Sequence, residues 1–157
     1  AELFLRQFGT GGEDAATALL VRDDGAGGAR GEAVLAQTQS QWDGVFTAEQ
    51  AKRGEGLYSQ YCASCHGPDL AGGEMAPGLT GGEFSSNWND LSLGELFDRI
   101  RTSMPQNSPG SLSRQQNADI LSYMLFKASV PAGQAELPTQ TEVLGTIKFV
   151  ASKPAGN

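Results

Sequence analysis

The sequence has no long hydrophobic run and few basic residues, and each shortage argues against a class of function. A membrane-spanning helix needs about 20 mostly apolar residues in succession, and no segment of the printed sequence approaches that length. Lys and Arg total 11 against 18 Asp and Glu, which gives a formal net charge of −7. Nucleic-acid binding requires clustered basic residues. We therefore expect no transmembrane segment and no nucleic-acid partner.

Apolar side chains are also scarce. They make up 39% of the chain, below the usual value of roughly 45–50%. Glycine, with 21 residues, is over-represented. Such a chain buries little side-chain surface for its length, so a large apolar ligand would help to fill its core. A length of 157 residues suits one compact domain with an appendage.

Cysteine and histidine are rare, and all of them lie together. The chain has two cysteines and one histidine, within the segment Cys62-Ala63-Ser64-Cys65-His66. A disulfide between the two cysteines would close a very short loop and add little stability. A structural zinc site needs four ligands, and this cluster offers three. A redox pair of the thioredoxin type is expected in a βαβ setting, whereas here a helical pattern precedes the motif and a Gly-rich segment follows it.

The pattern C-x-x-C-H is the attachment signature of haem c. Residues three apart share one face of a helical turn, so Cys62 and Cys65 can form thioether bonds with the two vinyl groups of one haem. His66 then lies beneath the macrocycle with its imidazole directed at the iron. We expect one covalently bound haem c.

The second axial ligand must come from another residue type, because His66 is the only histidine. Met104 precedes Pro105 at the end of a predicted helix, where a loop can turn its thioether toward the iron. Met75 lies in the Gly-rich segment close to the motif. Met124 lies on the apolar face of a helix, where a methionine usually packs in the core. Met104 is the predicted ligand, and Met75 or an open site are the alternatives.

The middle of the chain has the pattern of helices. Thr47 is a suitable N-cap, and apolar residues recur downstream at helical spacing. Gly54 and Gly56 would each cost about 1 kcal/mol in an isolated helix, so both are expected where another helix approaches closely. Residues 67–88 are rich in Gly and Pro and are predicted as loop, whereas 142–150 are rich in β-branched residues and predict a strand. Helices are predicted over 48–61, 91–104 and 113–127.

The N-terminal part has a different composition. Leu3–Phe8 and Ala15–Val21 are apolar runs separated by a Gly-rich turn, which predicts a β-hairpin or a pair of extended strands. They are too apolar for a free tail, so residues 1–36 are expected either to pack on the rest of the chain or to add as a strand to a neighbouring subunit. Trp42, in the connector that follows, is expected to be exposed. The predicted parts are an arm over 1–44, a haem domain over 45–130 and a tail over 131–157.

Residues from about 45 to 130 resemble class I c-type cytochromes, in particular small monohaem bacterial domains attached to or partnered with quinoprotein dehydrogenases. Gly54 and Tyr58 match the positions where the N-terminal helix of that family meets the C-terminal helix, and Leu121 and Tyr123 match the corresponding positions of the C-terminal helix. The resemblance implies an all-α cytochrome c fold around one covalent haem, here preceded by an extended or hairpin arm. The arm and the tail are departures from the compact family domain.

The resemblance also implies roles around the haem. Pro77-Gly78-Leu79 is similar to the Pro-x-Leu loop of the family, in which the proline carbonyl accepts the proton of the ligating histidine and the leucine covers the ring; an ordinary turn proline is the alternative. Trp88 resembles an aromatic residue that donates a hydrogen bond to a haem propionate, with core packing as the alternative. Arg99 and Arg101 are candidates to pair with a propionate, or else are solvated. The expected haem-binding residues are Cys62, Cys65, His66, Met104, Pro77, Leu79, Trp88 and Tyr58, of which His66 and Met104 bind the iron.

These expectations define a function. The chain is expected to carry single electrons by outer-sphere transfer between Fe(III) and Fe(II), with no substrate at the iron, and therefore not to be an enzyme. Its partners would be redox proteins such as a dehydrogenase, an oxidase or another cytochrome, and its acidic charge suits a partner with a basic docking patch. One alternative is a subunit of a cytochrome polymer or larger complex assembled through residues 1–36, and another is a haem that binds a small ligand or reduces peroxide. Because haem c maturation occurs outside the cytoplasm, an exported protein is expected, whether periplasmic, at the cell surface or extracellular.

Overall fold

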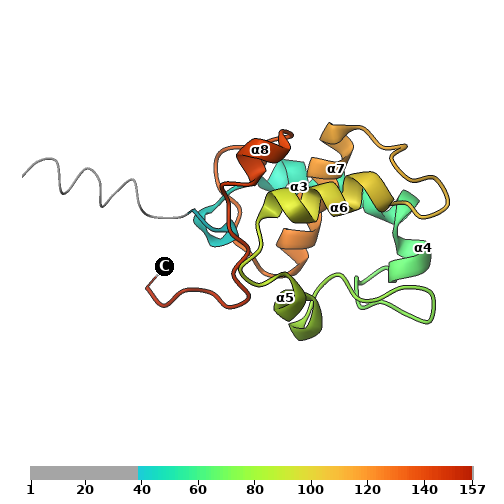
Figure 1. The fold of residues 1–157 in the computed structure, drawn as a ribbon, viewed down its shortest axis with the longest axis horizontal. Coiled ribbons are helices and arrows are strands. Elements are labelled where there is room, and N and C mark those ends of the chain that lie inside the picture. The colour runs from blue at the N-terminus through green and yellow to red at the C-terminus, as the bar shows by residue number, and fades with distance from the viewer. Residues whose placement is uncertain (1–38, 157) are drawn as a thin grey trace, which may run out of the picture. The chain divides into compact units, whose positions relative to one another are not determined.

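The computed structural model describes residues 39–156, which belong to the second of two compact units of the chain, 38–157. The predicted strands of the arm, within residues 1–36, lie outside the described residues. Throughout the described part every named element is a helix and no strand occurs (Figure 1), so the all-α prediction is confirmed. The elements are η1 (Gln41–Asp43), α3 (Ala48–Tyr61), α4 (Ala63–His66), α5 (Gly82–Trp88), α6 (Leu93–Ser103), α7 (Arg114–Lys127) and α8 (Thr141–Leu144).

The three long helices begin where their capping residues predict. The Thr47 side chain accepts a hydrogen bond from the Gln50 amide at the start of α3. Ser92 and Ser113 start α6 and α7, each in a capping box completed by a Glu or Gln side chain three residues later. These caps satisfy amide groups that a helix leaves without partners in its first turn. The predicted helices 48–61, 91–104 and 113–127 are confirmed to within two residues at each end.

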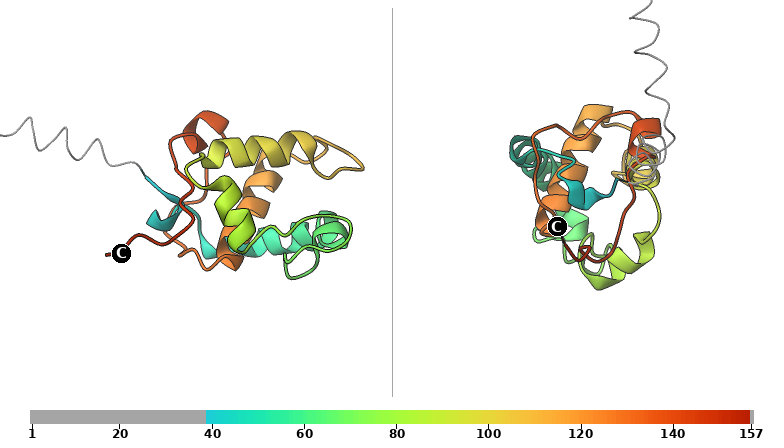
Figure 2. Two further views of the ribbon diagram at one scale, coloured as in Figure 1. Left: turned by 60° about the horizontal axis from the view of Figure 1, so that its bottom comes forward. Right: turned by 90° about the vertical axis from the view of Figure 1, so that its left-hand side faces the viewer.

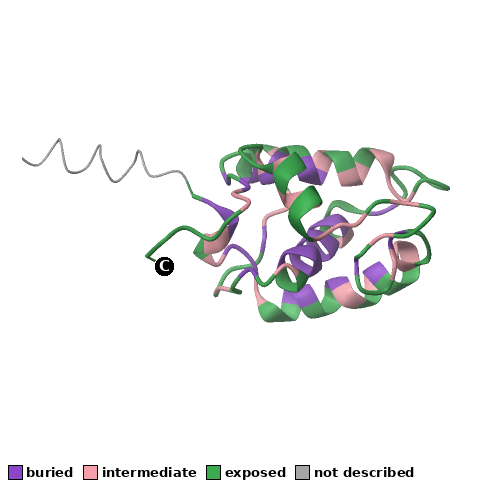
Figure 3. Ribbon diagram, turned by 90° about the horizontal axis from the view of Figure 1, so that it is seen from below, coloured by how far each residue is buried: buried purple, intermediate pink, exposed green. Residues whose placement is uncertain are grey.

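Helices α3 and α7 cross in close contact. A Cβ atom on Gly54 would lie 1.8 Å from the carbonyl oxygen of Asp119, so only glycine allows this approach. The Tyr58 and Tyr123 rings, 5.4 Å apart between centroids, extend the contact. The middle of helix α7 is buried on all sides, since every residue from Asn117 to Leu125 is buried (Figure 3). The expectation for Gly56 was wrong, because nothing lies within 4 Å of a Cβ built there.

The predicted strand over 142–150 was wrong. Its first residues form α8, and in its second half Lys148 makes only isolated bridges to Ser40 and Ser92. Each of those serines begins a helix and donates its own amide to a capping carboxylate, that of Asp43 or Glu95. The flanking segments therefore turn away after one pair of residues, and no ladder of strands can grow.

The C-terminal segment belongs to the compact unit and does not form a separate tail. The side chain of Gln50 bonds to both backbone groups of Leu137. Its Nε2 donates to the Leu137 carbonyl at 3.1 Å, and its Oε1 accepts from the Leu137 N–H at 2.6 Å. Gln41 makes the same paired contact with Val150. Both glutamines are buried. The apolar residues of this segment join the core that contains Val45 and Phe46, namely Leu137, Leu144, Ile147 and Phe149.

Two further predictions need correction. Trp42 is half-buried rather than exposed, because it packs against the core and its indole nitrogen donates to the Val150 carbonyl at 2.9 Å. Residues 67–88 are not loop throughout, since α5 occupies their last seven positions. Helix α5 has no side-chain cap, and none of its residues is fully buried, so its sequence lacks the usual helix signals.

The two ends of the described unit lie side by side. The Gln41 amide bonds to the Lys148 carbonyl at 3.1 Å, and the Lys148 amide bonds to the Gln39 carbonyl at 2.8 Å. Figure 2 shows these ends at the opposite side of the unit from α4. Among residues 39–156 no helix is long and apolar enough to span a membrane.

Candidate functional site

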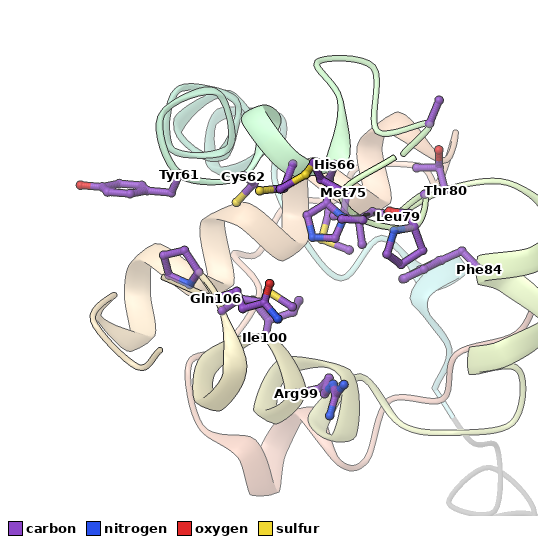
Figure 4. A pocket seen from close by; sticks show the side chains of 18 of the residues that line it. Tyr61, Cys62, His66, Met75, Leu79, Thr80, Phe84, Arg99, Ile100 and Gln106 are labelled. Atoms are coloured by element: carbon purple, nitrogen blue, oxygen red, sulfur yellow. Dashed lines mark hydrogen bonds between the residues drawn. The ribbon is translucent and has the colours of Figure 1, made fainter. Parts of the chain in front are cut away.

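A cavity of about 820 Å³ opens between α4, the loop after it, α5 and α6 (Figure 4). Cofactor sites in proteins typically measure about 300–1,000 Å³, so this volume suits a large ligand. Apolar side chains from different elements form its walls, among them Leu79 before α5, Phe84 in α5 and Ile100 in α6. The cavity therefore provides the space for the apolar ligand that the composition of the chain predicts.

Both cysteines line the cavity. Helix α3 ends at Tyr61, and the Cys62 carbonyl then accepts hydrogen bonds from the amides of Cys65 and His66, at 3.1 and 3.0 Å. This tight turn brings all three motif residues to the same cavity. The cysteines form no disulfide; Cys62 is half-buried and Cys65 is exposed. Burial, with a smaller contribution from Cys65, raises the pKa of the Cys62 thiol to about 11.

His66 is held in one orientation by the loop that follows it. Its Nδ1 atom lies 2.8 Å from the Pro77 carbonyl oxygen. A carbonyl can only accept, so Nδ1 carries the proton and Nε2 keeps a free lone pair for a metal ion. The loop folds back tightly enough that a Cβ on Gly72, whose φ is +81°, would lie 2.4 Å from the Gly78 nitrogen. The structure thus brings together His66, Pro77 and Leu79, as the resemblance implies.

All three methionines line the cavity, but from different places. Met104 ends α6, with its amide bonded to the Ile100 carbonyl at 2.9 Å. Figure 4 places Ile100 and Gln106, which flank Met104 in sequence, across the cavity from His66. Met75 lies 77% exposed in the loop that carries Pro77, on the His66 side. Met124 is 3% exposed within an apolar cluster, so the arrangement favours Met104 as the residue opposite the imidazole.

The end of the cavity away from the cysteines carries polar donors. Thr80 and Arg99 lie there, far from Cys62 in Figure 4, and Trp88 also lines the cavity. Within the described residues the Trp88 indole nitrogen has no hydrogen-bond partner, and the ring stands beside Phe84 at 6.2 Å between centroids. Arg101 does not line the cavity, and its guanidinium pairs with Asp98 at 3.1 Å.

Within residues 39–156 Arg99 has no carboxylate partner, for an identifiable reason. Glu95, four residues earlier and the usual partner on a helix, accepts hydrogen bonds from Ser92 at the N-terminus of α6. Asp98 accepts from Arg101 and from Thr141. The cation that faces the cavity is therefore available to an anionic group of a ligand.

Tyr58 does not line the cavity, although it was expected among the haem-binding residues. It is completely buried at the crossing of α3 and α7, and its hydroxyl donates to the Gly67 carbonyl at 2.6 Å. Burial raises its pKa well above the ordinary tyrosine value. Its contact is with the residue after His66, so it positions the start of the loop. Conversely, sequence reasoning missed Thr80, Phe84, Gln106 and Asn107 as lining residues, because no motif marks them.

The donor set fits a covalently bound haem. Two free thiols lie on one turn, the imidazole of His66 lies next to them with Nδ1 bonded to Pro77, and methionine side chains line the same cavity. Among the residues that the structure describes, no group of three or more His, Cys, Asp or Glu side chains is placed to hold a metal ion.

Comparison with protein families agrees with this fit. Residues 49–124 match the family model described as "Cytochrome C oxidase, cbb3-type, subunit III". These residues form a c-type cytochrome domain. The family implies a covalently bound haem c and a role in electron transport. The matched residues include nearly all of α3, the Cys-Ala-Ser-Cys-His motif, Met104 and most of α7.

Comparison with curated protein sequences gave no match. Among solved structures, the sulfane dehydrogenase SoxCD from Paracoccus pantotrophus is similar at 22% identity and a TM-score of 0.49. The alignment covers 73% of the present chain and 62% of that one.

Proposed function

We propose that the cytochrome domain carries single electrons by outer-sphere transfer, with His66 and Met104 as the two ligands of one haem iron. The observation that supports this proposal is the side of the cavity opposite His66. Ile100 and Gln106 lie there (Figure 4), and Met104, which stands between them in the sequence, lines the same cavity; none of the three side chains titrates near neutral pH. A haem bound there supplies a one-electron Fe(III)/Fe(II) couple.

The residues of the chain perform three tasks in this proposal. Cys62 and Cys65 hold the group covalently. The Pro77 carbonyl keeps Nδ1 of His66 protonated and the ring fixed, so that Nε2 remains the ligand. Met104 would supply the second protein ligand of the iron, which would leave no place for a substrate. The apolar walls exclude water and disfavour the more highly charged oxidised iron, which raises the potential.

In this proposal electrons enter and leave the haem at the end of the cavity where the two cysteines lie. Cys65 is exposed there, so the edge of a haem attached to it would be within reach of another protein. The proposed donor and acceptor are redox proteins that dock through a small, short-lived interface. Since haem c is attached outside the cytoplasm, we place the mature protein in the periplasm, at the cell surface or outside the cell.

A redox titration of the purified full-length protein tests this proposal. The haem is expected to remain bound after denaturation and extraction with acidic organic solvent, because thioether bonds survive that treatment. The titration should follow a one-electron Nernst curve, with a slope of about 59 mV per tenfold change in the ratio of the two forms. Tight binding of carbon monoxide or cyanide by the native protein at neutral pH would contradict the proposal, since it would indicate an open iron and favour the ligand-binding alternative.

We further propose that Arg99 pairs with a haem propionate. An Arg99→Gln variant removes a positive charge that stabilises the reduced form, so its midpoint potential is expected to fall by on the order of tens of millivolts. Arg101→Gln is the matched control, because Arg101 pairs with Asp98 and does not line the cavity. Potentiometric titration of both variants checks the prediction, and an equal shift in the two would contradict the pairing.

A further inference from the structure

The mouth of the cavity on the cysteine side is built from segments without charge. Charged residues make up 18% of the chain. Nevertheless the three segments 56–68, 75–82 and 102–113 contain no Asp, Glu, Lys or Arg. The first holds the end of α3 and the attachment motif, the second holds the Pro77 loop, and the third runs from the end of α6 to the start of α7. They are far apart in sequence, so only the fold brings them together.

Each of these segments contributes exposed side chains to the cavity lining. We call these residues the uncharged rim; they are Gln60, Ser64, Met75, Gln106 and Asn107. Figure 4 shows Gln106 on one side of the cavity and Cys62 and Met75 on the other. Among the described lining residues only Glu83 and Arg99 are aspartate, glutamate, lysine or arginine, and Arg99 lies at the far end. The described lining thus carries one acidic and one basic side chain, whose formal charges cancel, and Glu74 precedes Met75 in the sequence.

Met75 is the most exposed large hydrophobic residue of the described chain, at 77%. A single exposed apolar side chain is common on protein surfaces, so Met75 is considered together with the uncharged residues around it. Methionine is flexible and polarizable, so it can pack against differently shaped partners. The surrounding amides and the Ser64 hydroxyl can exchange hydrogen bonds with a partner or with water between the two surfaces.

We propose that the uncharged rim is the docking face for a redox protein that presents an equally uncharged, partly apolar contact face; this rests on the proposed electron-carrier function. A Lys or Arg placed over the rim would lose hydration without gaining an opposite charge. An uncharged partner face does not lose the hydration of a charge, and contact with it would bury the apolar side chain of Met75. The proposed partner therefore lacks the basic docking patch that the net charge of the chain suggests.

The chain itself provides a protein probe, because a second copy presents the same uncharged rim. The electron self-exchange rate between reduced and oxidised full-length protein can be measured from NMR line widths as a function of ionic strength. In Gln106→Glu a like charge faces its counterpart across the contact, so self-exchange is expected to slow roughly three- to tenfold at low salt. The difference should vanish at high salt, where the Debye length falls to about 3 Å.

Gln140→Glu is the matched control. Gln140 is exposed, lies at the start of α8 and does not line the cavity. The substitution therefore adds the same negative charge outside the uncharged rim. Its self-exchange rate is expected to stay within about twofold of the unmodified protein, since a distant exposed charge is screened. If both variants slow equally, exchange depends on total charge alone and the rim is not the docking face.

A small cationic oxidant, used in place of a partner with a basic patch, tests whether the site of electron exit is negatively charged. Oxidation of the reduced protein by tris(phenanthroline)cobalt(III) should depend only weakly on ionic strength if electrons leave through an uncharged mouth. A steep fall of the rate with added salt would show a negatively charged exit and would overturn the rim proposal. Neither result touches the proposed function, which fails only if the haem shows no reversible one-electron couple.

Discussion

A Met104→His variant is expected to lose the weak near-infrared absorption band of methionine-ligated ferric haem and to be reduced at a much lower potential. Met/His ligation raises the haem potential relative to bis-His ligation. The fall should be a substantial part of the roughly 0.8 V over which axial ligands set haem potentials. Absorption spectra of both oxidation states and a potentiometric titration measure the two effects.

The other methionines of the cavity are the controls for this experiment. Met75→Leu removes a thioether that is exposed on the His66 side, and Met124→Leu removes one that is buried among apolar residues. Both variants are expected to keep the near-infrared band and a potential close to that of the unmodified protein. Loss of the band in Met75→Leu, with retention in Met104→His, would assign the ligand to the loop instead.

A Gly54→Ala variant is expected to lower the free energy of unfolding by about 3 kcal/mol or more. The added Cβ would stand 1.8 Å from the Asp119 carbonyl oxygen and 2.9 Å from Cβ of Tyr123. Neither the Asp119 carbonyl nor the Tyr123 Cβ can move away unless α3 and α7 separate, because the first is a backbone group of α7 and the second is attached directly to its backbone. Overpacking of this kind usually costs about 1–3 kcal/mol, and a clash with backbone belongs at the upper end or beyond.

Gly56→Ala is the matched control on the same helix. Nothing lies within 4 Å of a Cβ at this position, so the substitution is expected to raise the free energy of unfolding by about 1 kcal/mol through helix propensity alone. Denaturant unfolding of the haem-loaded proteins, followed by helical circular dichroism, measures both values. Equal effects in the two variants would contradict the close crossing of α3 and α7 at Gly54.

Candidate haem-binding residues that lie close together in the sequence could be proposed from the sequence, whereas those whose surroundings depend on distant segments could not. Cys62, Cys65 and His66 lie within one turn, and Pro77 lies only eleven residues from His66, so a short motif and a family resemblance were enough to propose them. Tyr58 matched a family position just as well, but the crossing of α3 and α7 buries it outside the cavity. Arg99 and Arg101 were equivalent candidates in the sequence. Only the structure distinguishes them. Arg101 forms an ion pair with Asp98, whereas Glu95, the residue that could pair with Arg99, accepts a hydrogen bond from Ser92 at the N-terminus of α6.

The sequence by itself determined the starts of the long helices, the attachment motif and the all-α class of the described unit. Capping, helical spacing and a five-residue motif are interactions between neighbours, which the order of residues states directly. The tertiary structure alone decided that residues 142–150 form α8 and isolated bridges, that the C-terminal segment completes the core, and that three distant uncharged segments meet at one mouth. Those outcomes depend on contacts such as Gln50 with Leu137, 87 positions apart. Local preference cannot determine such contacts, because they form only when the whole unit is packed.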